Sequence, residues 1–350
     1  MRVLIVKTSA LGDIIHALPV LDYLHQVVSG IEVDWVVEER FVDILSGNPL
    51  VSQLFTVDTK KWRKKLLSPV TWREISSLRQ QLEARRYSIV FDIQGNFKSG
   101  LIAKFSGCSR RYGFDAEAVR ESLNLKFTTN QVPLRRQDYH VTDRSLRVVS
   151  VPFGKDYSAL KLGSDIVTDS EEDQSAELFL ATLNDGLVFL FHPGTTWVTK
   201  LWHESGWIAL GKELTDKFPE STILISSGGG EEKQVAENIK SGIGRQTRLL
   251  PQLSIKGFTA IIKKVDLMFG GDTGPIHLAA AVATPTVSFY RATDGKRNGP
   301  RGDIHRIVQS PLPCTKCLLK QCGKDQSCRE SIDVNEMLGA AEELLLSDGR

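Results

Sequence analysis

The chain alternates short, apolar, β-branched runs with amphipathic helical patterns, and this order constrains the fold more than any other feature. The apolar runs predict strands at Val3–Val6, Val33–Val37, Ser88–Ile93, Leu187–Phe191, Thr222–Ile225, Val265–Phe269 and Pro285–Phe289. The patterns between them predict helices over Ile14–Val28, Trp72–Arg85, Glu171–Leu183, Trp207–Lys217, Glu231–Ile239 and Pro275–Val282. Strands that alternate with helices form parallel sheets covered on both faces, so we predict an α/β fold.

The length and the spacing of the pattern predict two domains. At ~150 residues per domain, 350 residues suffice for two. The alternation thins between Val149 and Glu171 and restarts with a strand at Leu187. We therefore expect two doubly wound, Rossmann-like domains, residues 1–165 and 166–330. Ligands of such sheets bind outside the carboxyl ends of the strands, so we expect a site where the two domains face each other across a cleft.

Composition excludes several classes of protein. Hydrophobic residues make up 41% and charged residues 25%, as in ordinary globular proteins, and the formal net charge is only +2. No apolar run approaches the ~20 residues of a membrane span, and the short N-terminal run does not resemble a signal peptide. We expect a cytoplasmic monomer with no nucleic-acid partner, in which any anion-binding surface is local.

The first predicted strand leads into a turn that carries one carboxylate, Asp13, directly after Gly12. An Asp near the start of a helix is commonly an N-cap. A carboxylate at a strand end can also act as a general base that accepts a proton from an attacking hydroxyl. The G-x-G-x-x-G fingerprint is missing from this turn, which disfavours an NAD-dependent oxidoreductase.

Two later strand ends carry groups that suit phosphate. The stretch FHPGTTWVTKLW (Phe191–Trp202) places Thr195, Thr196 and Lys200 after a buried strand. Hydroxyls, backbone N–H groups and a Lys ammonium can bind phosphate oxygens, although a surface loop with a solvated Lys is an equally simple interpretation. The stretch SSGGGEEK (Ser226–Lys233) places Glu231 at a helix start, where it either binds a sugar hydroxyl or favours the helix dipole.

The most specific stretch is FGGDTGPIHLAAA (Phe269–Ala281). Two glycines permit close approach, Asp272, Thr273 and Gly274 form a turn, and a Pro follows at the first helical position. The free N–H groups of such a helix start suit a diphosphate. Asp272 either binds a sugar hydroxyl or caps the helix, and His277 either donates to a phosphate oxygen or is a packing residue.

Two further clusters stand out. The stretch KKWRKKLL (Lys60–Leu67) is either a solvated face or a patch for a phosphorylated lipid at an anionic membrane surface. Four of the five Cys residues lie in a segment over 314–328, namely Cys314, Cys317, Cys322 and Cys328. Their spacing allows a structural zinc site, an iron–sulfur cluster or unliganded thiols.

Taken together, these stretches resemble glycosyltransferase family 9, the lipopolysaccharide heptosyltransferases. The resemblance covers nearly the whole chain and rests on the opening MRVLIVKTSALGDIIHALPVL and on the GDTGPIHLAAA motif. The stretches VDWVVEERF, KKWRKKLLSP and DIQGNFKS are similar to the heptosyltransferase I type in particular. Trp197 and Val198 stand where its members are more polar, and the four-Cys segment is absent from the best-known enzymes of this type.

The resemblance implies a GT-B fold and an inverting transfer of L-glycero-D-manno-heptose from ADP-heptose to the inner Kdo of Kdo2-lipid A, with no cofactor needed for catalysis. It implies an acceptor-binding N-terminal domain and a nucleotide-sugar-binding C-terminal domain. We also expect a last helix, about residues 331–350, to pack back on the N-terminal domain. The enzyme would then work as a peripheral protein on the cytoplasmic face of the inner membrane.

The resemblance also assigns roles to individual residues. Asp13 matches the proposed general base. Thr195, Thr196 and Lys200 match contacts of the donor phosphates, and Glu231 matches an acid near the ribose. The heptose and diphosphate loop corresponds to Asp272, Thr273 and Gly274, with His277 on a further matching position. The basic residues that meet the anionic acceptor correspond to Arg63, Lys64 and Arg120.

Other functions remain open at this stage. A heptosyltransferase II-type enzyme would use a heptosyl acceptor, and a sugar-nucleotide 2-epimerase of the same fold would isomerise the donor without an acceptor. A non-enzymatic nucleotide-binding module would bind ADP and release no sugar.

Overall fold

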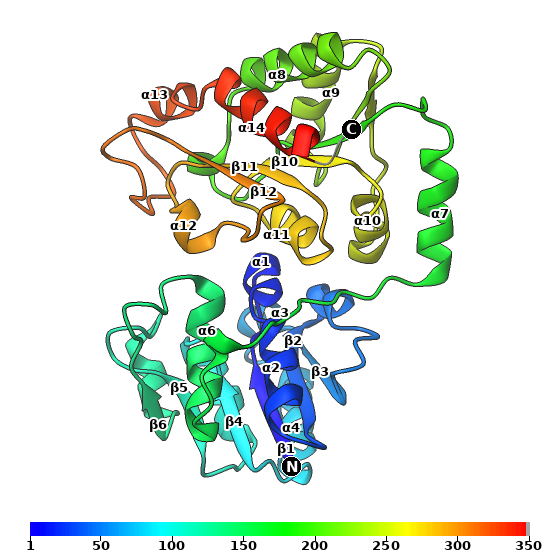
Figure 1. Ribbon diagram of the computed structural model, residues 1–350. Coiled ribbons are helices and arrows are strands. Elements are labelled where there is room, and N and C mark those ends of the chain that lie inside the picture. The colour runs from blue at the N-terminus through cyan, green and yellow to red at the C-terminus, as the bar shows by residue number, and fades with distance from the viewer. Residues whose placement is uncertain (348–350) are drawn as a thin grey trace. The chain divides into compact units, whose positions relative to one another are not determined.

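A computed structural model describes residues 1–347 of the chain, which forms two compact units divided between Val167 and Thr168. Each unit is built on its own six-stranded parallel sheet with helices on both faces (Figure 1). The predicted α/β class is therefore confirmed, and the observed division lies two residues after the expected one.

The N-terminal unit has the strand order β3-β2-β1-β4-β5-β6. Its strands are β1 (Arg2–Val6), β2 (Glu32–Glu38), β3 (Gln53–Val57), β4 (Ile89–Asp92), β5 (Arg111–Phe114) and β6 (Asn130–Val132). Its helices are α1 (Leu11–Ile15), α2 (Pro19–Val27), α3 (Thr59–Lys64), α4 (Pro69–Ala84), α5 (Phe97–Phe105) and α6 (Val141–Ser150), with short 3-10 turns at Glu39–Ile44, Ser122–Lys126, Val151–Phe153 and Tyr157–Ala159. The order reverses at β1 and β4, which leaves a crevice at their carboxyl ends.

The C-terminal unit has the order β12-β11-β10-β7-β8-β9, which is the same topology counted from β7. Its strands are β7 (Val188–His192), β8 (Thr222–Ile225), β9 (Thr247–Leu249), β10 (Leu267–Gly271), β11 (Thr286–Tyr290) and β12 (His305–Gln309). Its helices are α7 (Ser170–Leu180), α8 (Glu204–Lys217), α9 (Glu231–Ile243), α10 (Ile255–Ile262), α11 (Gly274–Ala281), α12 (Gly295–Asn298), α13 (Asp325–Glu330) and α14 (Val334–Ser347), with a 3-10 turn at Val198–Lys200. Here the order reverses at β7 and β10.

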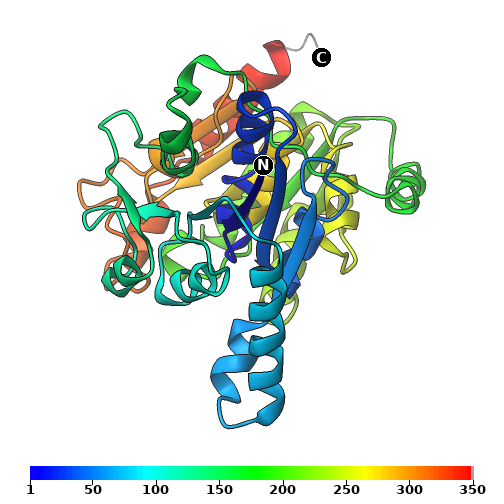
Figure 2. The ribbon, with the colours of Figure 1, turned by 90° about the horizontal axis from the view of Figure 1, so that it is seen from below.

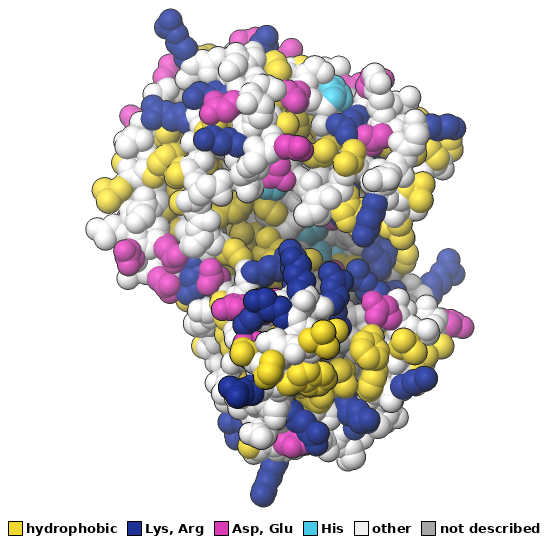
Figure 3. Space-filling view, turned by 180° about the vertical axis from the view of Figure 1, so that it is seen from behind, with side chains coloured by type: hydrophobic (Ala, Val, Ile, Leu, Met, Phe, Trp, Pro, Cys, Tyr) yellow, Lys and Arg dark blue, Asp and Glu magenta, His cyan; other side chains and the backbone are white. Residues whose placement is uncertain are grey.

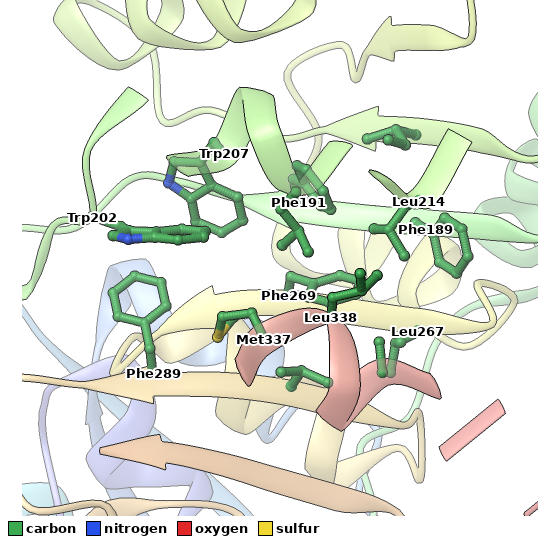
Figure 4. Packing of buried hydrophobic residues seen from close by; sticks show 14 of the residues in the cluster. Phe189, Phe191, Trp202, Trp207, Leu214, Leu267, Phe269, Phe289, Met337 and Leu338 are labelled. Carbon is green, nitrogen blue, oxygen red and sulfur yellow. The ribbon is translucent and has the colours of Figure 1, made fainter. Parts of the chain in front are cut away.

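Alternate residues of the buried strands face opposite layers of helices, as the period of a strand requires. In the N-terminal unit, Leu4 and Val6 of β1 pack with Leu78 and Leu82 of α4. In the C-terminal unit, the layer between the sheet and α8 and α14 is rich in aromatic rings, and rings of β7, β10, β11 and α8 pack against one another in T-shaped and tilted pairs (Figure 4). Rigid cores therefore hold the strand ends of both sheets in place.

Two sequence-based expectations are wrong. The helix expected over Ile14–Val28 is divided into α1 and α2, because Pro19 has no N–H group and its ring cannot continue the preceding turn. The last helix, α14, which was expected to pack back on the N-terminal domain, is part of the C-terminal unit: Met337, Leu338 and Ala341 belong to the core of that unit. Their apolar stripe fits the surface that α8 and the β11 and β12 strands leave uncovered.

The packing of α14 predicts a large difference between two substitutions on the same helix. Met337 is fully buried, whereas Leu346 is 75% exposed. Because a buried cavity costs free energy, Met337→Ala should lower the free energy of unfolding of the C-terminal unit by about 2–5 kcal/mol. Leu346→Ala should change it by no more than about 0.5 kcal/mol. Urea denaturation followed by circular dichroism measures both, and equal effects would contradict this packing.

Candidate active site

The carboxyl ends of β1 and β4 carry the first group of polar side chains. Asp13 lies half-buried in α1, and its Oδ2 accepts a hydrogen bond from the Ala10 N–H at 3.2 Å. Asp13 is therefore not the N-cap of α1, which is Ala10, but the third residue of the helix, and its side chain bonds back to the N-cap N–H. Among the described residues, no hydrogen bond engages the second carboxylate oxygen, Oδ1, so capping uses only one of the two oxygens.

Lys7 follows β1 directly and is only 8% exposed. Its Nζ donates to the Ile93 carbonyl oxygen at 3.2 Å. Burial lowers the pKa of Lys7; the charges of Asp13 and Asp92 oppose this shift, and those of Arg120 and Arg144 add to it. Asp13 is therefore one charge in a group that is otherwise mostly basic.

The structure places Arg120 in this group, and its role toward the acceptor stays a prediction; Lys7 and Arg144 also belong to the group, and the sequence analysis did not single them out. Lys7 could have been found, because a charged residue directly after a buried strand lies at the ligand edge of a parallel sheet. Arg144 lies on α6, far along the chain, and only the fold shows its place.

A buried carboxylate, Asp92 at the end of β4, holds the loops of this edge together. Burial raises the pKa of Asp92, while hydrogen bonds from the Gly95 N–H, Asn124, Ser99 and the Gln94 N–H oppose the rise. The Gln94 side chain in turn accepts from the N–H groups of Thr8 and Ser9, both at 3.1 Å. The turn before Asp13 is therefore tied to the end of β4.

Arg63 and Lys64 lie on α3, where both are exposed. No hydrogen bond or ion pair within residues 1–347 joins them to Asp13 or Arg120. A pocket of about 630 Å³ opens beside them between β3, α3 and α4, and its lining includes Lys61, Trp62 and Arg73. None of the predicted site residues lines this pocket.

In the C-terminal unit, the ends of β7 and β10 bring Lys200 and Asp272 together. Lys200 Nζ lies 2.7 Å from Asp272 Oδ2, and His277 Nε2 lies 3.1 Å from Oδ1. Burial alone would raise the pKa of Asp272, but the hydrogen bond from His277 and the charge of Lys200 hold it well below its usual value. Asp272 is therefore a carboxylate at neutral pH, and Lys200 is paired rather than solvated.

Glycines make this approach of the two loops feasible. A Cβ at Gly271 would lie 3.0 Å from the Lys200 carbonyl oxygen, and one at Gly270 would lie 2.7 Å from Ile276 Cγ1. A Cβ at Gly194 would collide with the Glu232 carboxylate, which accepts from the Gly228 N–H at 2.7 Å. Any larger side chain would therefore push apart the loops that follow β7, β8 and β10.

The other predicted donor residues lie around this pair. Thr195 and Thr196 stand in the loop after β7, half-buried and exposed respectively. Thr273 precedes α11, which begins at Gly274, so the N-terminal amides of α11 lie beside Asp272. Glu231 is the exposed first residue of α9. The packed acid of this turn is its neighbour Glu232, which the sequence analysis did not single out.

The segment over 314–328 packs against the same loop. Thr199 Oγ1 donates to the Leu319 carbonyl oxygen at 2.6 Å, and the ammonium groups of Lys200 and Lys320 lie 4.8 and 5.1 Å from the centre of the Trp197 ring. The buried guanidinium of Arg291 joins the Leu201 carbonyl oxygen to Asp325. This segment therefore braces the loop that carries Lys200.

For the cysteines of this segment, the sequence left open a zinc site, an iron–sulfur cluster or unliganded thiols. Cys314 and Cys317 are exposed, Cys322 and Cys328 are half-buried, and all four are free thiols. Within residues 1–347, no group of three or more His, Cys, Asp or Glu side chains is arranged to hold a metal ion. The prediction of a zinc or iron–sulfur site has no support here, and the bracing contacts come from other residues of the segment.

Comparison with known protein families identifies the family to which this chain belongs. The family model described as glycosyltransferase family 9 (heptosyltransferase) matches residues 75–327. The chain belongs to glycosyltransferase family 9. This confirms the family that the sequence motifs indicated, and the protein is a glycosyltransferase.

Relatives and solved structures agree with this assignment. Lipopolysaccharide heptosyltransferase 1 of Pseudomonas aeruginosa is 33% identical over 92% of this chain and 87% of its own length. The enzyme of that name from Escherichia coli K12 is 30% identical over 89% of this chain and 94% of its own. The structure of E. coli heptosyltransferase WaaC with ADP has a TM-score of 0.77 at 28% identity, covering 96% of this chain and all of that one. These homologues support heptose transfer in the assembly of the lipopolysaccharide inner core.

The fold is also confirmed by more distant neighbours. A family 9 glycosyl transferase from Veillonella parvula has a TM-score of 0.84 at 18% identity, covering 99% of this chain and 97% of that one. The GT-B class of this family 9 enzyme is therefore as predicted. Among residues 1–347, no helix is both long enough and apolar enough to cross a bilayer.

A buried histidine at the carboxyl end of β7 predicts how the free energy of unfolding depends on pH. Burial lowers the pKa of His192, at the end of β7, to about 4, and its Nδ1 lies 2.9 Å from Ser226 Oγ. Between pH ~6.5 and ~4 the unfolded chain binds a proton at this residue that the folded protein does not. The free energy of unfolding should therefore fall as the pH drops through this window, by roughly 1–3 kcal/mol from His192 alone.

NMR titration measures the pKa of the His192 ring in the folded protein, and the His192→Gln variant identifies the signal of this ring. The variant should lose the corresponding part of the pH dependence in urea denaturation. A ring that titrates near pH 6.5 in the folded protein would contradict the prediction.

Proposed function

We propose that this family 9 enzyme transfers L-glycero-D-manno-heptose from ADP-heptose to the inner Kdo of Kdo2-lipid A, with inversion at the anomeric carbon. The observation that carries this proposal is the position of Asp13, a carboxylate with one uncommitted oxygen among Lys7, Arg120 and Arg144. A basic surrounding suits an acceptor that carries carboxylates, and the partly free carboxylate of Asp13 suits proton removal from its hydroxyl. Relatives named lipopolysaccharide heptosyltransferase 1 support the same reaction.

The donor would bind at the Lys200–Asp272 edge of the C-terminal unit. Structures of E. coli WaaC are described with ADP and with ADP-2-deoxy-2-fluoro heptose. The N-terminal amides of α11 and the Lys200 ammonium supply positive charge for a diphosphate, with the Thr195, Thr196 and Thr273 hydroxyls as further donors. Gly274 leaves room at the helix start, and Glu231 would accept from a ribose hydroxyl.

Asp272 would serve the donor by orienting cations. In the described structure its two oxygens bind Lys200 and His277, which fixes both groups beside the amides of α11. An arriving diphosphate would share the Lys200 ammonium with this carboxylate. Because Lys200 is already held in place, little side-chain entropy would be lost when the donor binds.

The transfer itself needs one bond to form and one to break. Asp13 would take the proton of the acceptor hydroxyl as its oxygen bonds to the anomeric carbon of heptose. The bond from that carbon to the phosphate oxygen breaks on the opposite side, and ADP leaves with the electron pair. Preorganised amides and the Lys200 charge would stabilise the charge that develops on the diphosphate.

The acceptor would be met by basic residues of the N-terminal unit. Arg120, with Lys7 and Arg144, would bind carboxylates of Kdo near Asp13, and Arg63 and Lys64 would bind phosphates of the lipid. Since this acceptor is anchored in a bilayer, the enzyme would act as a peripheral protein at the cytoplasmic face of the inner membrane.

Two alternatives are less well supported. The E. coli heptosyltransferase II structure is 17% identical with a TM-score of 0.70, so its likeness shows the fold alone. UDP-GlcNAc 2-epimerase from Neisseria meningitidis is 14% identical with a TM-score of 0.50, which again concerns only the fold. An epimerase would also have no lipid acceptor for the exposed basic residues Arg63 and Lys64 to meet.

The deciding experiment incubates the enzyme with ADP-heptose and Kdo2-lipid A and detects one added heptose by mass spectrometry. A parallel reaction offers an acceptor that already carries one heptose. Product from the second acceptor alone would favour the heptosyltransferase II-type reaction, and product from neither would overturn the proposal.

Asp13→Asn should abolish transfer while donor binding survives, because the amide keeps the shape of the side chain but cannot take a proton. We expect kcat to fall by about 10²–10⁴-fold, the usual contribution of a general base. Calorimetry should give an unchanged Kd for ADP. Asp43→Asn, at a half-buried acid of the same unit with no proposed role, is the control. Retained kcat in Asp13→Asn would remove Asp13 from catalysis.

A further inference from the structure

A helical hairpin of the N-terminal unit has an apolar apex. Helices α3 and α4 are joined by a short loop and project together from the sheet (Figure 2). Near this loop, Leu66, Leu67, Val70 and Trp72 are 52%, 98%, 53% and 58% exposed. Four large hydrophobic side chains exposed within seven residues form a patch of the kind that marks an interaction site. We call these four residues the apex.

Hydrogen bonds within the hairpin hold α3, α4 and the apex together. Asp58 caps α3 by accepting from the Lys61 N–H at 2.8 Å. Across the hairpin, Lys61 and Trp62 donate to the Glu74 carboxylate at 2.6 and 2.8 Å. The Trp72 Nε1–H donates to the Leu66 carbonyl oxygen at 2.8 Å. The polar atom of the indole is therefore satisfied within the hairpin, and its apolar ring remains exposed.

The apex is surrounded by unpaired positive charge. Residues 58–74 contain six basic side chains, Lys60, Lys61, Arg63, Lys64, Lys65 and Arg73, and two acidic ones, for a net charge of +4. Glu74 pairs with Lys61, and within residues 1–347 the other five basic groups make no ion pair. On the face of this unit shown in Figure 3, Lys and Arg side chains lie directly beside hydrophobic ones.

We propose that the apex inserts into the interface of an anionic lipid bilayer. Apolar side chains at a protruding tip, with Lys and Arg beside them, match a surface that is anionic at the headgroups and apolar beneath. A soluble phosphate would satisfy the charges and leave the apolar side chains in water. A second copy of the chain would place one face of charge +4 against another, which is repulsive.

Insertion would explain how a lipid-linked acceptor is reached, and in this respect it rests on the proposed function. With the apex in the interface, Arg63 and Lys64 of the same hairpin stand at the level of the headgroup phosphates. The hairpin would then anchor the enzyme at the membrane and also bring the acceptor-binding residues to it.

The test measures binding to vesicles that contain no acceptor, so it does not depend on catalysis. Wild-type protein should co-sediment with phosphatidylglycerol vesicles, bind phosphatidylcholine vesicles far more weakly, and dissociate as salt screens the charges. The double variant Leu66→Ser/Leu67→Ser should bind at least about tenfold more weakly, because two apolar side chains no longer leave water. Leu178→Ser on α7, at a Leu that is 66% exposed, is the matched control and should bind like the wild type.

Fluorescence adds a readout of depth. Lipids brominated on their acyl chains should quench the wild-type emission, and Trp72→Phe should remove most of this quenching. Unchanged binding of the double variant, equal loss in the Leu178→Ser control, or absence of quenching would each overturn the proposal. So would a dimer in sedimentation velocity that the double variant abolishes, since the apex would then be covered by a second copy.

A water-soluble acceptor makes it possible to test membrane insertion and heptose transfer separately. The double variant should retain wild-type transfer to a deacylated, water-soluble acceptor and lose at least about tenfold on Kdo2-lipid A in vesicles. Retained transfer to the soluble acceptor also shows that the variant is folded. If wild-type protein inserts but transfers heptose to neither acceptor, the proposed function fails and membrane insertion stands.

Discussion

The reversal of strand order in each parallel sheet is the constraint on which the rest of this structure depends. Parallel strands present all their carboxyl ends at one edge, and right-handed crossovers carry the chain to opposite faces on either side of the reversal. In one unit this brings together the loops after β1 and β4, and in the other the loops after β7 and β10. Every residue predicted for catalysis, the donor or the acceptor, except Arg63, Lys64 and Glu231, lies in or directly beside one of these loops.

The carboxyl ends of the strands carry different arrangements of charge in the two units. In the C-terminal unit, a buried carboxylate is stabilised by Lys200 and His277, so its charge is balanced before any ligand arrives. Breaking such a buried pair is costly, which is why the arrangement holds Lys200 in one position. In the N-terminal unit, Asp13 is outnumbered by nearby cations, an arrangement that leaves net positive charge for an anionic acceptor. This difference in charge fits the proposed reaction, in which the N-terminal unit binds the acceptor and the C-terminal unit binds the donor.

The segment over 314–328 and the α3–α4 hairpin show how segments between and after the strands acquire separate roles. The first braces the Lys200 loop through the Thr199–Leu319 hydrogen bond and the Trp197 ring. The second includes α4, the crossover helix from β3 to β4, whose Leu78 and Leu82 pack in the core of the N-terminal unit. One end of the hairpin therefore belongs to the core, and the other end exposes the apex.

The sequence by itself determined the α/β class, the central strands of both sheets and the loops that carry Asp13 and Asp272, because buried strands and glycine-rich turns have strong local patterns. It missed short strands such as β6 and β9, whose few residues lie at sheet edges and are partly polar. It also placed α14 on the wrong unit, since an apolar stripe shows that a helix packs but not against what. Only the tertiary structure decided that Lys200 pairs with Asp272, that Lys7 and Arg144 lie near Asp13, and that the four cysteines, within residues 1–347, are not arranged as a group that could hold a metal ion. These facts depend on which distant segments become neighbours, and no local pattern contains that information.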